Sequence, residues 1–399
     1  MSSQSNKNTS VFSHTHIDRS GWKRVRLGDV CSIKARIGWQ GLKKSEYLNF
    51  GDYCLVSGTD FDNGFINWET CSYVNEWRYN QDANIQLQNG DVLVTKDGTI
   101  GKVAFVKGMV KPTTLNSGVF VIRPINGELL PTFLQLVFKS HYFSDFLDRI
   151  TAGSTIVHLY QKDIVDFDFP IPDVDTQLQI VKSISAIDDS IEVQQFRAAK
   201  YEAIKKATVN LLLKPKADWR QVSLGDIGDV LMCKRILKNQ TTEAGDVPFY
   251  KIGTFGKTPD SFITRAVFED FKTRFSYPKK GDVLLSAAGT IGRTVVFNGE
   301  DAYFQDSNIV WIDNDERIVT NRFLHVLYDQ LDWQTENGGT VSRLYNANIR
   351  NTKIVIPPLT EQKRIVTILD SIDSTINGFK SQLSKAQGIK KGMMTYFFG

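Results

Sequence analysis

The stretch Trp22-Lys23-Arg24-Val25-Arg26-Leu27-Gly28-Asp29-Val30 occurs twice in this chain. It returns, with conservative changes, as Trp219-Arg220-Gln221-Val222-Ser223-Leu224-Gly225-Asp226-Ile227. A match of this length indicates an internal duplication, and a duplicated scaffold can present two different surfaces. We therefore expect two copies of one fold that recognise a target in two parts, rather than one catalytic pocket.

Further motifs repeat in the same order along the chain. Gly90-Asp91-Val92-Leu93 and Gly98-Thr99-Ile100-Gly101-Lys102 return as Gly281-Asp282-Val283-Leu284 and Gly289-Thr290-Ile291-Gly292-Arg293. Leu159-Tyr160, Ile171-Pro172, Gln177, Ile180-Val181 and Ile187-Asp188 return as Leu344-Tyr345, Ile356-Pro357, Gln362, Ile365-Val366 and Ile372-Asp373. The order holds while the spacing drifts, so insertions and deletions have accumulated between fixed framework points.

Length and composition are those of a globular protein with two or three domains. The chain has 399 residues, of which 41% are hydrophobic and 23% charged. No apolar run reaches the length of a membrane span, and the N-terminus lacks the apolar stretch of a signal peptide. We therefore expect a cytoplasmic protein. The net charge of +4 permits DNA binding without arguing for it, because a local basic face decides that question.

The four cysteines are Cys31, Cys54, Cys71 and Cys233, three in one copy and one in the other. They form no Cys-x-x-Cys pair, and this distribution suits neither matched disulfides nor a zinc site. We expect small reduced core residues and no metal site.

Each copy is predicted to be a mixed α/β domain with a curved, mostly antiparallel sheet. Short apolar runs bounded by turn residues predict strands at 91–94, 103–106, 118–122 and 167–169, and again at 283–285, 294–297 and 309–312. Helical spacing predicts a helix over 130–150, after Pro131 at its first turn, and a second helix near 322–333. Residues 1–20 are rich in Ser, Asn, Thr and Gln, and we expect a flexible tail there.

Each copy then closes with a long helix, expected to start at Asp175 or Thr360, both good N-cap residues. Apolar residues recur there in alternating steps of four and three, which is heptad spacing, so the two helices can bury these seams against each other as an antiparallel, coiled-coil-like pair. Gly378, Gly388 and Gly392 weaken the second helix, so its last turns are expected to fray or to lean on a partner. The predicted seam comprises Ile180, Ile184, Ile187, Ile191, Ile365, Leu369, Ile372, Ile376, Phe379 and Leu383.

These motifs resemble a known family. Two ordered sets of Trp-(Lys/Arg)-x-Val-x-Leu-Gly-Asp, Gly-Asp-Val-Leu, Gly-Thr-Ile-Gly-(Lys/Arg), Ile-Pro and Gln-x-x-Ile-Val are similar to those of type I restriction–modification specificity subunits. The resemblance covers residues 22–398. It implies an α+β protein with an internal pseudo-two-fold repeat, in which two long antiparallel helices join two target recognition domains. It also implies double-stranded DNA as ligand, with two adenine-N6 methyltransferase subunits and restriction or translocase subunits as partners.

The resemblance sets the expected boundaries of the parts. They are a tail over 1–20, a first target recognition domain over 21–172, a central helical region over 173–215, a second target recognition domain over 216–357 and a distal helical region over 358–399.

The sequence lacks the motifs of an enzyme. No Gly-x-Gly cofactor loop occurs, and the one Pro-Pro pair, Pro357-Pro358, has Ile356 before it and Leu359 after it instead of the polar and aromatic residues of an adenine methyltransferase. Gly256-Lys257-Thr258 is no phosphate loop, because position 251 is lysine and not glycine. We therefore expect a non-catalytic subunit, with AdoMet, ATP and Mg²⁺ bound by the partner subunits and the target base flipped into a partner's pocket.

Two pairs of repeated loops are candidates for contacts to the DNA backbone. Lys102 and Arg293 follow the glycine turns, where they could neutralise a phosphate; the alternative is a purely structural hairpin with a solvated cation. A later pair of small polar loops could donate hydrogen bonds to phosphates; the alternative is a simple connection whose Leu and Tyr pack inward. The candidates in these later loops are Ser154, Thr155, His158, Thr340, Ser342 and Arg343.

Base reading is expected from the segments that differ between the copies. Arginine and lysine can make paired hydrogen bonds to guanine, and glutamine can do so to adenine. The regions are stronger candidates than any single member, each of which could be an ordinary surface residue. The candidates are Lys34, Arg36, Trp39 and Gln40 in the first copy, and Lys234, Arg235, Lys251 and Thr254 in the second.

The alternative function is a tandem module for carbohydrate or protein ligands with a coiled-coil linker. Loss of binding to double-stranded DNA at raised salt distinguishes the two hypotheses, because phosphate contacts release counterions.

Overall fold

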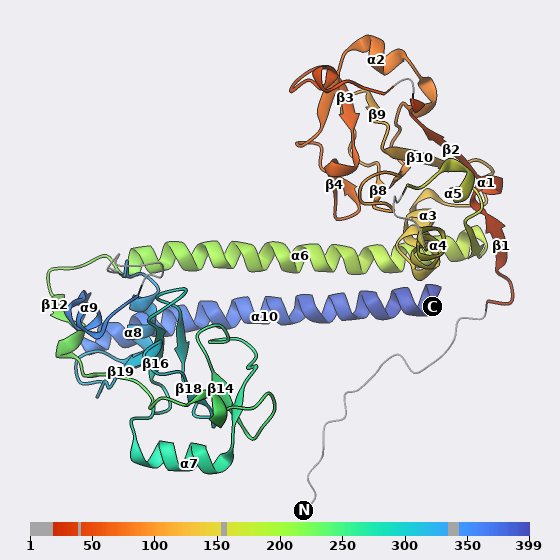
Figure 1. Cartoon of the computed structure of the whole chain (residues 1–399). Helices are drawn as coiled ribbons and strands as arrows, with labels where there is room; N and C mark the ends of the chain where they lie inside the picture. Colours follow the sequence, from red (N-terminus) through yellow and green to blue (C-terminus); the bar gives the residue numbers. More distant parts are fainter. Residues whose placement is uncertain (1–18, 39–40, 153–157, 334–342) are drawn as a thin grey trace, which may run out of the picture. The chain divides into compact units, whose positions relative to one another are not determined.

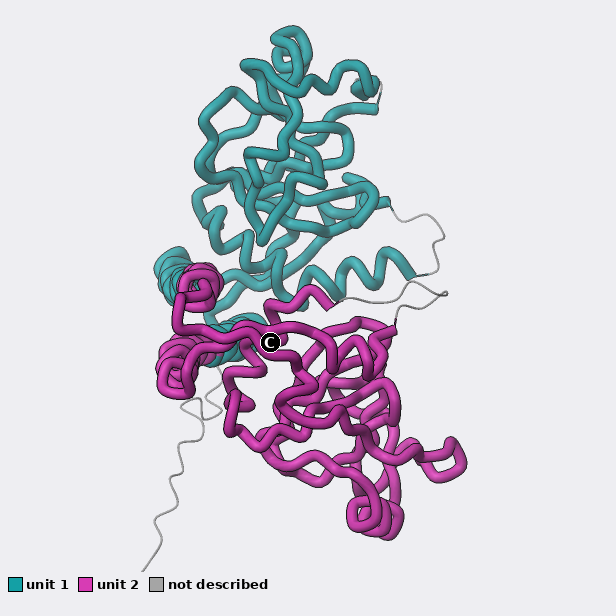
Figure 2. Tube along the Cα trace, turned by 90° about the vertical axis from the view of Figure 1, so that its left-hand side faces the viewer, with its two compact units in different colours: residues 1–195, 381–399 teal, residues 196–380 magenta. Residues whose placement is uncertain are grey.

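The computed structural model describes residues 19–38, 41–152, 158–333 and 343–399 (Figure 1). The chain divides into two compact units, of which unit 1 comprises residues 1–195 and 381–399 and unit 2 comprises residues 196–380 (Figure 2). Each unit contains one copy of the repeat together with part of both long helices. In the described part of the chain, none of the helices has an apolar stretch sufficient to cross a membrane.

Unit 1 has three sheets where the sequence predicted one. All strand pairs are antiparallel except β5–β8 and β3–β9, so the mostly antiparallel character is as predicted. The largest sheet has the order β2 (Cys31–Ala35), β10 (Val119–Pro124), β7 (Val92–Thr95), β8 (Val103–Phe105), β5 (Phe65–Ile66), β4 (Phe61–Asp62). The others are β6 (Ser72–Val74), β3 (Tyr53–Val56), β9 (Thr113–Leu115), and the pair β1 (Lys23–Arg26), β11 (Asp168–Ile171).

The helix predicted over 130–150 is two helices, so that prediction was wrong in one respect. α3 (Pro131–Phe138) starts at Pro131 as expected, and α4 (His141–Thr151) follows it. Ser140 interrupts them because its backbone is extended, with φ −91° and ψ 170°, and its hydroxyl donates a hydrogen bond to the Val137 carbonyl at 2.7 Å. Short helices complete the unit: α1 (Leu27–Val30), α2 (Glu76–Asn80) and α5 (Gln161–Ile164).

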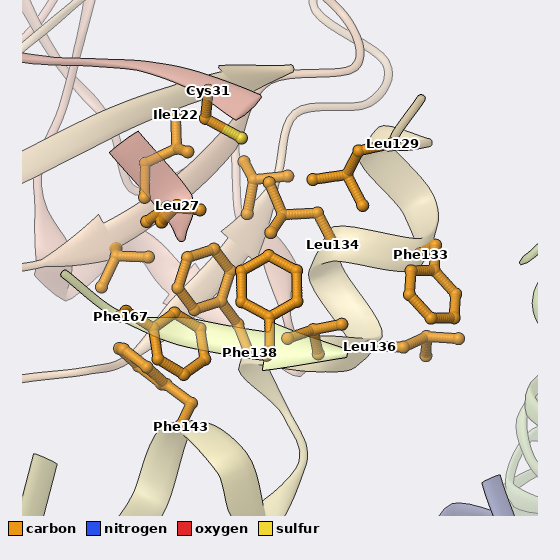
Figure 3. Close-up of a cluster of buried hydrophobic side chains, with 14 of the residues drawn as sticks. Leu27, Cys31, Ile122, Leu129, Phe133, Leu134, Leu136, Phe138, Phe143 and Phe167 are labelled. Atoms are coloured by element: carbon orange, nitrogen blue, oxygen red, sulfur yellow. The ribbon is translucent and has the colours of Figure 1, made fainter. Parts of the chain in front are cut away.

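The main core of unit 1 lies between α3, α4 and the large sheet (Figure 3). Phe138 packs against Phe143 and Phe167 with ring centroids 4.7 and 5.7 Å apart, and each buried Phe contributes about 1.5–3 kcal/mol. Cys31 belongs to this core, and all four cysteines are buried and free of disulfides. Phe398, near the C-terminal end of the chain, is buried in the same cluster and lies 5.6 Å from the ring of Phe133.

Unit 2 repeats the scheme with fewer strands in its main sheet. Here too the predicted single sheet is three. The helix predicted near 322–333 is also shorter than expected: it is α8 (Asn321–Tyr328), which ends five residues before the predicted end. The sheets are β13 (Val230–Leu231), β19 (Ile309–Ile312), β16 (Val283–Ser286), β17 (Thr294–Val296); β15 (Phe262–Ile263), β14 (Val247–Tyr250), β18 (Tyr303–Phe304); and the pair β12 (Arg220–Ser223), β20 (Lys353–Ile356). The remaining helices are α7 (Arg265–Arg274) and α9 (Asn346–Asn351).

The repeated Gly-Asp motif forms a tight entry into a buried strand in each unit. Gly90 and Gly281 have φ values of 100° and 98°, a conformation that side chains rarely adopt. The aspartate that follows is buried, and its carboxylate accepts a hydrogen bond from the backbone N–H three residues earlier, at 2.8 Å for Asp91 and 2.7 Å for Asp282. The motif is therefore structural in both copies.

A fully buried glutamine fastens the start of each long helix to its unit. The Gln177 side-chain amide donates to the carbonyls of Glu128 and Pro172, at 2.8 and 2.9 Å, and its oxygen accepts from the Leu130 N–H at 2.9 Å. Gln362 makes the same three bonds in unit 2, to the Ile318 and Pro357 carbonyls and from the Thr320 N–H. This clamp explains why the glutamine recurs in the repeated motif.

The two long helices are α6 (Val174–Leu212) and α10 (Leu359–Phe398). Each helix starts one residue earlier than predicted, and its capping residue differs from the predicted one. At the start of α6, the Asp173 side chain, not that of Asp175, accepts the Thr176 N–H at 2.9 Å. At the start of α10, the carbonyl of Pro358, two residues before the predicted Thr360, accepts from the N–H groups of Glu361 and Gln362.

The helices pack together through the heptad seam, and all ten predicted seam residues are buried or half-buried. A lysine interrupts the seam of each helix and pairs with the aspartate of the repeated Ile-Asp motif on the other helix. Lys390 lies 2.5 Å from Asp188 in unit 1, and Lys205 lies 2.6 Å from Asp373 in unit 2. In each unit, therefore, the same ion pair joins two antiparallel helices.

Candidate nucleic-acid interface

Unit 2 carries a polar hollow with a volume of about 1120 Å³. Three of the sequence candidates, Arg235, Lys251 and Arg343, line it together although they are far apart in the sequence. The connection that precedes β19 contributes Gln305, Asp306, Ser307 and Asn308 to its lining. The hollow thus brings together the residue types that recognise bases and phosphates.

Each of these cations is held in place by an acceptor within unit 2. Arg235 Nε donates to Asp306 Oδ2 at 2.9 Å, and Lys251 Nζ lies 2.8 Å from Asp260 Oδ1. Arg343 Nη2 donates to the Ser307 carbonyl at 3.1 Å. The hydrogen bond from Lys251 holds the pKa of Asp260 below its ordinary value, so this carboxylate keeps its charge to a lower pH than an unpaired aspartate. Cations fixed in this way meet a ligand with little loss of side-chain entropy.

Other candidates of the second copy lie outside the hollow. The Lys234 ammonium lies 5.3 Å from the ring centroid of Phe275, and the Thr254 hydroxyl accepts a hydrogen bond from the Lys251 N–H at 3.2 Å. Arg293 Nη1 donates to the Phe255 carbonyl at 3.0 Å. Thr254 therefore positions Lys251, whereas the guanidinium of Arg293 is engaged by the protein backbone.

In the first copy, Lys34 is exposed on β2 but Arg36 is not where the sequence suggested. Arg36 is only 2% exposed, and its guanidinium donates to the Leu115 carbonyl at 2.8 Å, to Gln81 at 3.1 Å and to Thr114 at 3.2 Å. Burial and the neighbouring Arg78 lower the pKa of Arg36. Aligned through the repeated Leu-Gly-Asp motif, the same position in unit 2 is Cys233, which is also buried. Arg36 is therefore a structural residue whose guanidinium is buried beneath the surface.

The Gly-Thr-Ile-Gly turns are structural hairpins in both units. Gly101 and Gly292 have φ values of 75° and 84°, and a Cβ on either glycine would lie 2.3 Å from Leu147 or 2.6 Å from Trp333. The Thr95 hydroxyl accepts from the Lys102 N–H at 2.9 Å, and Ser286 does the same for Arg293. The Lys102 side chain is exposed, so a phosphate contact by it stays a prediction.

His158 and Arg343 occupy the same place in the two units, directly before the repeated Leu-Tyr. Leu159 and Leu344 are buried, as the structural alternative predicted, but Tyr160 and Tyr345 are 54% and 50% exposed. The His158 imidazole pairs with Asp97 through Nδ1, and its ring centroid lies 4.4 Å from that of Tyr160. The exposed tyrosines are therefore additional surface candidates, and the structural alternative, which packed them inward, is wrong for them.

Six sequence candidates lie outside the described residues: Trp39, Gln40, Ser154, Thr155, Thr340 and Ser342. The sequence also missed one part of the lining of the hollow, Gln305 to Asn308. One signal could have found it, because Gln305 and Asn308 stand where the first copy has Leu115 and Gly118, at the same point of the repeat before a buried strand.

Comparison with known proteins identifies the family. Two matches to the family described as the type I restriction modification DNA specificity domain cover residues 19–202 and 216–386. The chain belongs to the type I restriction modification DNA specificity family. A member in Haemophilus influenzae, named as a type I restriction enzyme specificity subunit, is 41% identical over 310 residues, which are 74% of this chain and 78% of that protein.

More distant relatives carry similar names. The type I restriction enzyme MjaVIII specificity subunit of Methanocaldococcus jannaschii is 27% identical over 220 residues, or 52% of this chain and 50% of that protein. Among solved structures, the type I restriction-modification system S subunit from M. genitalium matches with a TM-score of 0.62 at 13% identity, over 95% of this chain and 96% of that chain. A chain from a study of complex assembly in the type I R-M system matches with a TM-score of 0.58 at 21% identity, over 95% and 98%. These likenesses show that this chain shares the fold of the type I specificity family.

Proposed function

We propose that this chain is the non-catalytic, DNA-reading subunit of a type I restriction–modification complex. Each unit would bind one part of a split duplex sequence, and the chain would dock two adenine-N6 methyltransferase subunits, through which restriction subunits join. The observation that carries the proposal is the hollow of unit 2 in a chain of this family, where four cations outnumber three carboxylates beside amide and hydroxyl groups. The cations are Arg235, Lys238, Lys251 and Arg343, and the carboxylates are Glu243, Asp260 and Asp306.

The hollow supplies two kinds of contact to a duplex. Arg235 is two-thirds exposed, so its terminal Nη groups can donate to a guanine edge or a phosphate while Nε stays bonded to Asp306. Asn308 carries an amide that can bind a base edge, and Gln305 can do so through its NH₂ group, because its Oε1 accepts from the Ile252 N–H at 2.9 Å. Lys251 and Arg343 line the same hollow. AdoMet, ATP and Mg²⁺ would be bound by the partner subunits, which would also receive the flipped adenine.

The face of α6 away from the seam is our candidate for docking a methyltransferase. Val193, Phe196, Ile204 and Leu211 are all exposed, Phe196 at 67% and Leu211 at 66%. At about 100° per residue they fall within roughly a quarter of the helix circumference. Large exposed apolar side chains that gather on one side of a helix are typical of an interaction surface, and here the exposed Lys200 lies among them between Phe196 and Ile204.

Charge reversal on the hollow tests the DNA-binding part of the proposal. The variant Arg235→Glu/Lys251→Glu is expected to lower the affinity of the assembled complex for its duplex by 100-fold or more, because both attraction and charge balance are lost. The measurement is a salt titration of binding, in which the slope of log K against log salt should fall by about two. Arg317→Glu, at an exposed arginine that does not line the hollow, is the matched control. Salt-independent binding of the wild-type complex, or an unchanged variant, would contradict the proposal.

Copurification tests the docking face. Phe196→Asp/Leu211→Asp should reduce capture of the methyltransferase subunit at least 10-fold, because charged groups would be buried in the contact. Lys206→Asp, an exposed position of α6 outside the docking face, should leave capture unchanged. Equal capture by both variants would exclude this face.

A further inference from the structure

Unit 1 contains a buried polar network that ends in an exposed loop. We propose that Glu46 and Arg78 are positioning residues that fix the loop 41–51 for reading one part of the DNA target. This inference rests on the proposed function, and the experiment below separates the two.

The loop 41–51 corresponds to a loop of unit 2 that lines the hollow. In unit 1 the Lys43 N–H donates to Glu46 Oε2 at 2.7 Å, and in unit 2 the Leu237 N–H donates to Gln240 Oε1 at 2.8 Å. Each loop then makes an isolated antiparallel bridge to an aromatic residue, Leu48 to Tyr73 and Thr242 to Phe262. The unit 2 loop contributes Lys238, Thr241 and Thr242 to the wall of the hollow. By this equivalence, the loop 41–51 borders the same face of unit 1.

The side chains that the loop exposes suit a nucleic acid. Phe50 is 83% exposed, and Tyr47 and Leu48 are also exposed, as are Lys43 and Lys44. Lysines can neutralise phosphates, while apolar and aromatic groups can contact thymine methyl groups or stack on unpaired bases. Such a loop presents these groups in one geometry only if neighbouring residues hold its conformation.

A series of hydrogen bonds made by charged side chains connects β9 to the loop 41–51. Arg78, on α2, holds Glu46 in a two-pronged pair with distances of 2.7 and 2.8 Å. Its Nη1 donates to Gln81 Oε1 at 2.9 Å, and the same oxygen accepts from Arg36 at 3.1 Å. Arg36 in turn is bound to β9 through the Leu115 carbonyl. The Glu46 carboxylate is thus the ion-pair partner of a guanidinium whose side chain is only 10% exposed.

Among the described residues, the equivalent loop of unit 2 has no counterpart of the Glu46–Arg78 ion pair. Gln240 stands in place of Glu46, and Cys233 stands in place of Arg36. On α7, which follows β15 as α2 follows β6, Arg265 pairs with Asp301 and not with the loop. Loss of the Glu46–Arg78 ion pair should therefore affect the reading of one part of the DNA target and not of the other.

The test compares variants in the complete complex with its methyltransferase partners. Arg78→Lys keeps the charge but loses the two-pronged geometry, and Glu46→Gln keeps the loop's own hydrogen bond but loses the ion pair. Affinity is measured for the cognate duplex and for duplexes altered in either part of the split sequence. We expect both variants to lower discrimination at least 10-fold in one part and to leave the other part unchanged. Arg265→Lys, on α7 of unit 2, is the matched control and should leave both parts unchanged.

The outcomes separate this inference from the proposed function. If the wild-type complex discriminates but both folded variants discriminate equally well, or lose both parts equally, the positioning role is wrong. If the wild-type complex shows no sequence preference, the proposed function itself fails. Should one of the two variants unfold, the other decides the test, because each removes the two-pronged pair by a different substitution, and it must lose discrimination in one part only.

Discussion

Gln177 and Gln362 show how a single polar residue can join two structural parts. Each side chain is fully buried and satisfies three backbone groups that would otherwise lack partners. An unsatisfied buried polar group costs about 1–3 kcal/mol, so Gln177→Leu should lower the free energy of unfolding of unit 1 by at least this amount. Urea denaturation measures the loss as a lower midpoint. Gln179→Leu, an exposed position two residues along the same helix, should leave the midpoint unchanged. A loss equal in both variants would show that the clamp contributes nothing specific.

Glu46 gives the stability of unit 1 a defined pH dependence. The Arg78 guanidinium and the Lys43 N–H lower the pKa of Glu46 from its ordinary 4.5 to about 2. A lowered folded-state pKa means that the stabilisation is complete above the unfolded pKa and is lost as the pH falls from about 4.5 towards 2. The difference in urea midpoint between wild type and Glu46→Gln should therefore be constant above about pH 5 and shrink below it. A difference that grows on acidification would contradict this assignment.

At the residue scale, the sequence predicted regions better than individual contacts. Arg235, Lys251 and Arg343 meet in one hollow, yet nothing in a linear sequence shows which cations the fold brings together. Arg36 resembled a surface arginine because its acceptors, Leu115 and Gln81, are distant in sequence. Burial of a charged residue depends on such distant partners, which periodicity cannot reveal.

At the scale of elements, α10 carries three glycines in positions that need no glycine. A Cβ on Gly378, Gly388 or Gly392 would meet nothing within 4 Å. Gly388→Ala should therefore stabilise the helix by up to about 1 kcal/mol, through reduced backbone entropy of the unfolded chain. Gly292→Ala is the contrasting variant and should destabilise, because φ is 84° and the added Cβ would lie 2.6 Å from Trp333. Thermal denaturation of both variants checks the two opposite signs.

The long helices and most core strands were predictable because their patterns are local. Heptad spacing gave the seam, and short apolar runs gave β7, β8, β10, β16, β17 and β19. The break between α3 and α4 was missed because apolar spacing continues across Ser140, while the hydroxyl that ends α3 competes for the helix carbonyl. The last turns of α10 were expected to fray or to lean on a partner, and fraying is wrong, because Phe398 is buried in the core of unit 1 of the same chain.

At the scale of the whole molecule, we predict that the helix pair sets the number of unspecified base pairs in the target. Deleting residues 197–203 and 375–381 removes one heptad from each helix, retains the pairs Asp188–Lys390 and Lys205–Asp373, and spares the four residues of the candidate docking face. Because a helix rises about 1.5 Å per residue, the methylated sequence should lose on the order of two or three spacer base pairs. Methylome sequencing measures the spacer directly. An unchanged spacer in an active variant would exclude this role of the helices.

The burial of Phe398 also has a consequence during synthesis. Residues 381–399 complete the core of unit 1, with Met393, Met394 and Phe397 packed beside Phe398. A ribosome that adds about 5–20 residues per second reaches this segment roughly 10–40 s after it has finished α6. During that interval the emerging polypeptide exposes Ile180 and Ile184 without their final cover. Nascent chains of this protein should therefore depend on ribosome-associated chaperones until translation is almost finished.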